Sequence, residues 1–503
     1  MKKLFAPVCT LAVALAIAAP AAFATTPEAG TAPAVEPVDT VDNVTPQLDG
    51  INIENAGADV VTGNMAVPAA FGNVTVGADT FRAFSIGTTS CNIGTVPLNW
   101  VQSNNNHPVI SQDVYRINSQ GRFEQIGMGW LKHSFCALQS QGGLPNGFCA
   151  SCSPTCGGCC STLGVGCWDP YTSARNGSQN LLGPRSDINA TTGAFPYPYT
   201  IAFNATGNAI YKRIQVNIND LNPALNPGAI YYVQTGYVAR DDALAGNGNN
   251  NVSSRQALIG GVNPNFSIGL TGTFNTTVPT IRRWPTHVPG AVVNQVFLDG
   301  ANLGSIDLGG YARDNGDGTW TYNYAVYNMN SHNSVYAFEV DAPSGLNITN
   351  VGMTFPKYHS GEPYTNNAWT GSYSGGKVRW IADATLAGNP NANALRWSTT
   401  YTFFFTANVG PTNGNARIEA FRTAATASTT LPVPSAPPIL IGDMNCDGIV
   451  SVGDIAGFVL ALTDPAGYAS TYPTCNINAG DINGDSVISV GDIAGFVTLL
   501  TGP

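Results

Sequence analysis

The chain of 503 residues has few charged side chains, few histidines and no long apolar run. Charged residues make up 10% of it, with 21 Lys and Arg against 31 Asp and Glu, and there are five His. The net charge of −10 argues against a nucleic-acid-binding protein, because that function needs a basic surface. No run of about 18 apolar residues occurs, so we expect no transmembrane segment.

The common catalytic motifs are also missing. The sequence contains no HExxH, no GxSxG, no phosphate-binding loop and no GxGxxG after a predicted strand. A glycosidase needs two opposed carboxylates, and the most suggestive acid is Glu362 beside His359, although a polar loop explains it equally well. His107 and His133 are open to two interpretations, as ligands or bases and as core histidines. We therefore assign no catalytic residue and leave open whether the protein is an enzyme.

The first residues have the pattern of a secretory signal peptide. Lys2 and Lys3 precede an apolar stretch at 11–19, and the small residues around Phe23 form a cleavage site. We predict a signal peptide over 1–24 and a secreted protein, extracellular or at the cell surface. Residues 25–48 contain acids but no base and are rich in Thr, Pro and Ala, which predicts an acidic low-complexity linker.

Residues 49–289 are expected to form a β-rich domain that contains most of the cysteines. Runs such as FRAFSI and AIYYVQTGYVA are strand-like and are separated by Gly- and Asn-rich loops. The texture of this region weakly resembles that of uncharacterised secreted bacterial proteins, and the resemblance implies no function.

Ten cysteines remain after removal of the signal peptide, and eight of them lie between residues 91 and 167. The run CASCSPTCGGCC contains two CxxC pairs, which would suit a four-thiolate zinc site. Disulfides are favoured in an oxidising compartment. We expect neighbouring Cys159 and Cys160 to reach different partners, and Cys446 and Cys475 are candidates to pair with each other.

A β-sandwich module is predicted over 290–423. WTYNYAVYNMNS, starting at Trp320, alternates aromatic and polar residues and follows DNGDG at 314–318, which is typical of a hairpin turn, although it could also bind calcium. The tryptophans of this module could stack on sugars, although most should lie in the β-core. Residues 424–440 are rich in Pro, Thr and Ala and are interpreted as a second linker.

The last 63 residues, 441–503, contain a tandem repeat. Residues 442–465 and 480–503 are identical at 16 of 24 aligned positions, with an offset of 38. Each copy contains a twelve-residue loop with oxygen-bearing side chains at positions 1, 3, 5 and 12. These residues are Asp443, Asn445, Asp447 and Asp454 in the first copy, and Asp481, Asn483, Asp485 and Asp492 in the second.

This spacing indicates calcium, because Ca²⁺ takes six to eight oxygen ligands from alternate loop residues and one backbone carbonyl at position 7. That carbonyl belongs to Ile449 in the first loop and to Val487 in the second. The segment contains seven acids and no Lys, Arg or His, so a cation is needed to offset the repulsion among the carboxylates. We predict two Ca²⁺ ions. Ser486 replaces the glycine of position 6, Gly448, and should strain the second loop.

A helix is predicted after each loop. Ile455, Phe458, Val459 and Leu462 follow the i, i+3, i+4, i+7 pattern of one apolar face, and the second copy repeats it. Ser451 and Ser489 stand where a helix N-cap is expected.

A duplicated loop-then-helix unit with Asp at position 12 resembles the type I dockerin module. The resemblance implies two calcium ions and two near-symmetric helices that bind a cohesin domain on another protein. In that family, loop positions 10 and 11 help to choose the partner. The matching residues here are the same pair twice, Val452 and Gly453, then Val490 and Gly491, which suits binding in two orientations related by a half-turn.

The expected fold class is therefore mainly β: a disulfide-bonded β-rich body with a β-sandwich module, followed by a small α-helical dockerin-like domain. The expected function is docking to a cohesin-type partner in an extracellular assembly related to polysaccharide. Three alternatives stay open. The loops are purely structural calcium sites, the body is a polysaccharide-degrading enzyme tethered by the dockerin-like domain, or it is a non-catalytic carbohydrate-binding or cell-surface structural module.

Overall fold

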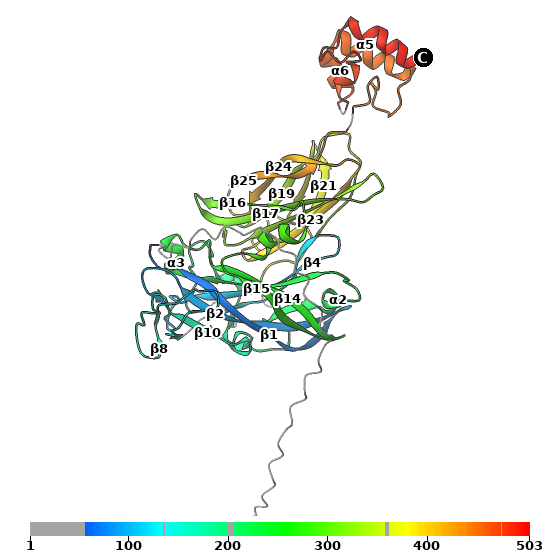
Figure 1. The fold of residues 1–503 in the computed structure, drawn as a ribbon. Helices are drawn as coiled ribbons and strands as arrows, with labels where there is room; N and C mark the ends of the chain where they lie inside the picture. Colours follow the sequence, from blue (N-terminus) through cyan, green and yellow to red (C-terminus); the bar gives the residue numbers. More distant parts are fainter. Residues whose placement is uncertain are drawn as a thin grey trace, which may run out of the picture. The chain divides into compact units, whose positions relative to one another are not determined.

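The structure is a computed structural model that describes residues 56–133, 136–198, 205–357, 362–437, 439–473 and 475–502. The predicted signal peptide (1–24), the acidic linker (25–48) and His359 lie outside these residues. The protein is mainly β-structure, as predicted, and its longer helices follow residue 450 (Figure 1). Among the described residues, no helix is long and apolar enough to cross a membrane.

The body is built on one sheet of eleven strands among the described residues. Eight of them follow each other in the order β1 (Val60–Val76), β2 (Asp79–Asn92), β12 (Ile214–Asn217), β5 (Phe123–Met128), β4 (Val109–Ile117), β13 (Ile230–Val238), β14 (Val252–Val262) and β15 (Asn265–Asn275). Three short strands pair beside this path: β6 (Leu131–His133), β10 (Trp168–Tyr171) and β11 (Leu182–Gly183). The two end strands, β1 and β15, contact each other, so the sheet curls towards closure.

Strand β13 shows why the body needs apolar residues on both faces of its sheet. Tyr231 and Val233 face a core cluster that also contains Phe84 and Ile268, whereas Tyr232 faces a different cluster. Successive side chains of a strand point to opposite faces, so a strand that is covered on both sides loses the simple alternation of apolar and polar residues. Short helices connect the strands: α1 (Ser173–Asn176), α2 (Ile218–Leu221), α3 (Arg240–Ala245) and α4 (Trp284–His287).

The cysteine-rich part of the body is held by four disulfides. They join Cys91 to Cys149, Cys136 to Cys159, Cys152 to Cys167, and Cys156 to Cys160. The structure therefore confirms the predicted disulfides instead of a zinc site. Cys159 and Cys160 bond to different partners, as predicted. The same stretch contains two small ribbons, β3 (Leu98–Asn99) with β9 (Thr162–Leu163) and β7 (Ala137–Leu138) with β8 (Cys159–Cys160), and otherwise has little regular structure.

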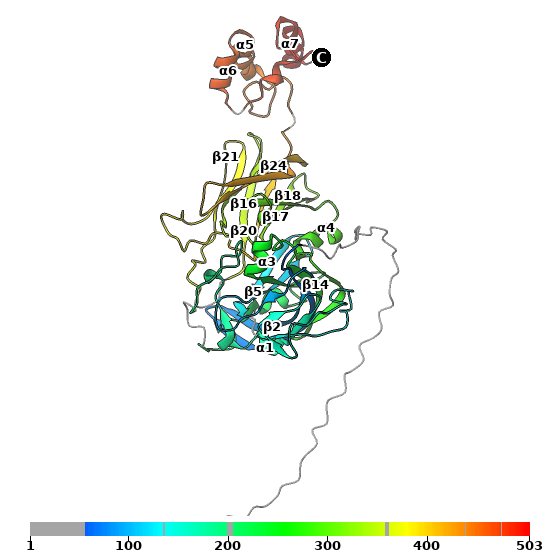
Figure 2. The same ribbon diagram turned by 90° about the vertical axis from the view of Figure 1, so that its left-hand side faces the viewer.

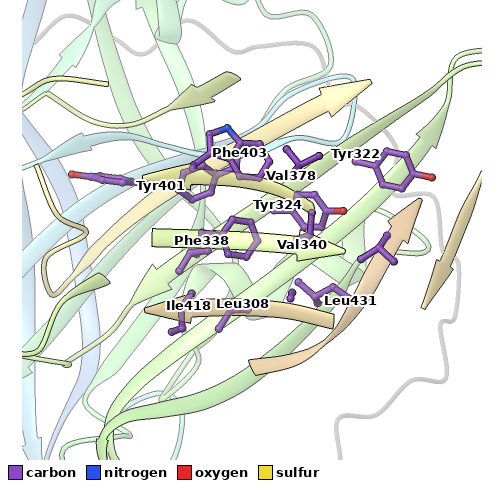
Figure 3. Close-up of a cluster of buried hydrophobic side chains, with 14 of the residues drawn as sticks. Leu308, Tyr322, Tyr324, Phe338, Val340, Val378, Tyr401, Phe403, Ile418 and Leu431 are labelled. Atoms are coloured by element: carbon purple, nitrogen blue, oxygen red, sulfur yellow. The ribbon is translucent and has the colours of Figure 1, made fainter. Parts of the chain in front are cut away.

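The second module contains two antiparallel five-stranded sheets that share one core. One sheet has the order β16 (Val292–Gly300), β17 (Leu303–Asp314), β18 (Trp320–Asn328), β23 (Thr399–Ala407) and β20 (Ile348–Thr354). The other has the order β21 (Thr370–Ser374), β22 (Lys377–Ile381), β19 (Val335–Asp341), β24 (Pro411–Ala420) and β25 (Thr426–Pro434). Figure 3 shows the aromatic side chains between them, with the rings of Phe338 and Phe403 5.1 Å apart. The predicted turn at 314–318 joins β17 to β18.

The predicted linker 424–440 contains strand β25, which the sequence interpretation missed. Leu431 and Val433 are buried in the sandwich core, at 1% and 2% exposure, although they stand among prolines and threonines. The strand lies at the edge of its sheet, where β24 is its one pairing partner among the described residues. Proline is tolerated at an edge because no further ladder hydrogen bond is lost there, so a composition typical of a linker is compatible with a strand.

Buried polar contacts join the body to the sandwich. The Arg185 guanidinium lies 2.9 Å from the Asp113 carboxylate, with both side chains at most 2% exposed, and it also donates to the carbonyl of Ser398 at 2.6 Å. The Gln125 side chain accepts the backbone N–H of Thr400 at 2.7 Å. Because these groups would be costly to bury unpaired, the two modules depend on each other at this joint.

The C-terminal repeat domain contains the helices α5 (Ile455–Thr463), α6 (Pro465–Thr471) and α7 (Ile493–Thr501) (Figure 2). The helices predicted after each loop are α5 and α7. Helix α6 was not predicted. Asp464, the only acid of the segment outside a ligand position, caps α6 by accepting the N–H of Gly467 at 2.9 Å, and Pro465 occupies the first turn, where proline is favoured.

Candidate calcium loops and docking face

Each repeat begins with its twelve-residue loop and passes directly into a helix. The loop ends in a 3-10 turn, Val452–Asp454 or Val490–Asp492, which continues into α5 or α7. Ser451 and Ser489 are the N-caps, as predicted. Their hydroxyl oxygens accept the N–H groups of Gly453 and Gly491, so both loops enter their helices in the same way.

The aspartate at position 12 closes each loop. Asp454 is fully buried, and its Oδ1 accepts the N–H groups of Met444 at 2.7 Å and Asn445 at 2.9 Å, while Oδ2 accepts that of Ser451 at 2.8 Å. Asp492 makes the corresponding three bonds in the second loop. One carboxylate therefore links the start of the loop to the start of the helix, which is a geometric reason for Asp at this position.

Positions 3 and 5 hold each other in the same manner in both loops. The Asn445 amide donates to Asp447 at 3.1 Å, and the Asn483 amide donates to Asp485 at 3.0 Å. Each position-5 aspartate also accepts the N–H of position 7, from Ile449 in the first loop and from Val487 in the second. The predicted ligand residues are thus wound into one local hydrogen-bonded turn in each copy.

The two loops differ at position 1. Asp443 is 7% exposed; its Oδ2 accepts the N–H of Gly448, and its Oδ1 is buried without a hydrogen-bond partner. In the second loop, Asp481 accepts the N–H groups of Gly484, Asp485 and Ser486. A buried carboxylate oxygen without a partner is costly, so the first loop contains an acceptor that a cation would satisfy.

The donor set of the loops suits calcium, although the carboxylates are not gathered. All side-chain donors are oxygens, which Ca²⁺ prefers, and no basic residue lies in 441–503. Across the residues with assigned structure, no three Asp, Glu, His or Cys side chains lie closely enough together to hold a metal ion. For a loop to hold an ion, its carboxylates would have to move closer together.

The predicted apolar face of the helices is divided between core and solvent. Phe458 is buried, as expected, whereas Ile455 and Val459 are 44% and 50% exposed. The predicted partner-binding residue Val452 is 75% exposed and stands on the same stripe, three residues before Ile455. The equivalent residues of the second copy have nearly the same exposures: Val490 81%, Ile493 42% and Val497 50%. Gly453 and Gly491 are exposed beside them. We call the six exposed valines and isoleucines the docking face: Val452, Ile455, Val459, Val490, Ile493 and Val497.

A groove of about 230 Å³ lies between strands β4, β5 and β12 of the body and the end of sandwich strand β20. Arg116 holds two carboxylates there, with Nη2 2.8 Å from Glu124 and Nη1 3.1 Å from Asp220. Burial raises the pKa of Asp220, and the charge of Arg116 opposes that shift. The rest of the groove is lined by polar and apolar residues that include Gln215, Thr354, Phe355 and Lys357.

The sequence interpretation missed this groove. Arg116 and Glu124 face each other across the β4–β5 hairpin, and the turn NSQGR between the two strands is a signal from which their pairing could have been predicted. Asp220 is more than ninety residues away and is brought in only by the sheet, so no local signal could have found it.

Glu362, His107 and His133, which the sequence suggested as possible functional residues, are held in contacts that support the fold. Glu362 accepts the backbone N–H groups of Arg185 at 2.6 Å and Ser186 at 3.3 Å, and burial raises its pKa. The rings of His107 and His133 are buried side by side, with Nε2 of the first 2.9 Å from Nδ1 of the second. Burial lowers the pKa of His107 to about 4. These contacts favour the structural interpretation of all three residues.

Comparison with known proteins adds little. No protein-family model matches the chain, and no curated protein matches it. A serine-rich repeat protein of Streptococcus agalactiae is 9% identical with a TM-score of 0.19, over 75% of this chain and 92% of that one. The N-terminal domain of a Streptococcus gordonii adhesin is 6% identical with a TM-score of 0.16, over 70% of this chain and 62% of that one. Scores this low carry no argument about fold or function.

Proposed function

We propose that this is a secreted docking protein. Its C-terminal dockerin-like domain binds two calcium ions and attaches the body to a cohesin-type domain in an extracellular, polysaccharide-related assembly. The observation that carries the proposal is the docking face, in which the same apolar residues are exposed at matching positions of both repeats. The five disulfides and the signal-like N-terminus support an oxidising compartment outside the cytoplasm.

The exposed residues have the chemistry of a protein interface. Apolar side chains grouped at matching places on two helices are costly in water and are typical of interaction sites. Because both copies present Val, Ile and Val at the same spacing, a partner that fits one copy fits the other after a half-turn. The absence of basic residues from 441–503 leaves the apolar groups as the main source of affinity.

Calcium would act on the docking face through the position-12 aspartates. Asp454 and Asp492 are at once predicted ligands and the residues that start α5 and α7. An ion held by either loop would therefore fix where its helix begins and how its apolar side chains are presented. Metal binding of this kind is coupled to folding.

The test uses the full chain without its signal peptide and a panel of immobilised cohesin-type domains, with binding measured by biolayer interferometry. We expect binding in calcium and its loss in EGTA. The control is the double variant D443N/D481N, which should fail to bind in either buffer. Calcium-dependent stabilisation of the chain without binding to any cohesin would favour the purely structural calcium sites and would refute the docking function.

The groove between the body and the sandwich favours a second function, the binding of a neutral carbohydrate. Glu124 and Asp220 each bind Arg116 through one carboxylate oxygen. The second oxygen of each carboxylate has no side-chain hydrogen bond among the described residues. Two carboxylates fixed on one guanidinium are good acceptors for sugar hydroxyls, and Phe355 supplies an apolar surface in the same groove. Glycosidases instead place an acid and a second carboxylate on opposite sides of the bond to be cleaved.

A glycan panel tests this second function. We expect retention of the full chain on at least one insoluble glycan, no soluble products, and loss of retention in E124Q/D220N. Release of reducing sugars that the same double variant abolishes would assign the groove to an enzyme instead.

A further inference from the structure

We infer that the two loops bind calcium unequally, with the first loop as the tight site and the second as the weak site, and that the disulfide between Cys446 and Cys475 sets the difference. The inference rests on the proposed calcium function. It goes beyond that function, and beyond the strain expected at Ser486, because it assigns the tight site to the burial and the disulfide of the first loop. Three differences between the copies carry it.

The first difference is the state of position 1. Asp443 is buried and has one oxygen without a partner, so binding an ion satisfies a group that is otherwise costly. Asp481 is more exposed and already accepts three N–H groups of its own loop. An ion in the second loop therefore offsets a smaller desolvation cost than an ion in the first loop.

The second difference is how each loop holds its turn. Each loop has one residue other than glycine in the left-handed region, Cys446 at position 4 (φ 58°) and Ser486 at position 6 (φ 68°), while Gly448 and Gly484 occupy the complementary places. Left-handed backbone is unfavourable for residues with a Cβ atom. Cys446 is held in it by the bond to Cys475, which lies 29 residues away, whereas Ser486 has no such tether.

The third difference is support from outside the loop. The Tyr468 hydroxyl, on helix α6, donates to the backbone carbonyl of Met444 at 3.0 Å, and both side chains are buried. Ile482 is the equivalent of Met444 in the second loop, is only half-buried, and receives no such bond among the described residues. The first loop is thus fixed by a covalent bond and a buried hydrogen bond.

A loop that is already ordered loses less conformational entropy when it binds an ion. The first loop should therefore keep its backbone turn without calcium, so that only its carboxylate side chains have to move towards the ion. The second loop has the same turn, but no disulfide holds its strained residue Ser486 in place, so more of its ordering has to accompany ion binding. We expect the first site to bind calcium roughly tenfold or more tightly than the second.

Isothermal titration of the EGTA-stripped full chain tests the inference, with D443N/D481N as the blank. We expect two phases, of which D443N removes the tight one and D481N the weak one. Removal of the tight phase by D481N, or a single phase with two ions bound per chain, would overturn the inference and leave calcium binding intact. No heat above the blank would instead refute the calcium function itself.

Two further variants separate the tether from backbone strain. C446G/C475S removes the disulfide while placing at position 4 the residue that tolerates its backbone, and we expect the tight site to weaken roughly tenfold. S486G should tighten the weak site several-fold. An unchanged tight site in C446G/C475S, with near-native circular dichroism, would refute the role of the disulfide.

Discussion

Phe458 and Phe496 stack on each other in the repeat domain, with ring centroids 4.0 Å apart and planes inclined by 15°. The two residues occupy the same place in the two copies, 38 positions apart, and each is 3% exposed. The repeats therefore meet through the same residue. This self-pairing explains why neighbouring positions, such as Val459 and Val497, have equal exposures of 50%.

Truncation of either phenylalanine should destabilise the repeat domain to a similar extent. F458A and F496A each leave a cavity and remove one half of the stack, so we expect a loss of about 3–5 kcal/mol in the free energy of unfolding. Scanning calorimetry of the full chain in calcium measures it, with V459A as the exposed control, for which little change is expected. A large effect of one truncation and none of the other would show that the copies do not share one core.

The docking face should tolerate damage to one copy. I455D and I493D each place a charge on one half of the face, and a partner can still approach in the orientation that uses the intact half. We expect each single variant to retain cohesin binding within a few-fold, and the double variant to lose more than about a hundredfold, or roughly 2.7 kcal/mol. Equal loss in a single variant and the double variant would exclude two equivalent orientations.

The buried histidine pair should make stability depend on pH. Burial keeps His107 and His133 neutral, lowering the pKa of the first from 6.5 to about 4 and that of the second well below 6.5. Between pH 6.5 and 4 these histidines take up protons in the unfolded chain but not in the folded chain, so their contribution to stability is complete above pH 6.5 and falls with decreasing pH. For His107 alone the loss is on the order of 3 kcal/mol.

Urea unfolding at a series of pH values between 7 and 4 measures this loss. In H107Q the slope of unfolding free energy against pH should be smaller over the same interval, because one of the two groups no longer titrates. A slope that H107Q leaves unchanged would place the acid sensitivity elsewhere in the chain.

The joint between body and sandwich should depend on the Asp113–Arg185 pair. D113N keeps the shape of the side chain but leaves a buried guanidinium without its counter-charge, and we expect a loss of about 3–5 kcal/mol in unfolding free energy. D79N, which breaks the solvent-exposed pair with Lys357, is the matched control and should unfold like the unsubstituted chain. Equal stability of the two variants would show that the joint does not need the charge pair.

Local patterns predicted much of the architecture. The hairpin at 314–318, the strands around Trp320 and Phe403, and the N-caps Ser451 and Ser489 depend on side-chain alternation and turn chemistry that a short window contains. Strand β25 was not predicted because its prolines and threonines are typical of a linker. Its alternation of buried and exposed residues becomes evident only in the pairing with β24. The groove was missed because Asp220 joins Arg116 only through the folded sheet.

For this protein the amino-acid sequence by itself determined the repeat, its ligand spacing, the likeness between its two copies and the preference for disulfides over zinc, since all of these are matters of local order and composition. Tertiary structure decided which half of each helix stripe is buried, how the eight cysteines between residues 91 and 167 pair, and that Asp443 and Asp481 differ in their hydrogen bonds. Two copies with the same ligand spacing acquire unequal surroundings because each packs against different residues, and burial and hydrogen bonding then set their energies.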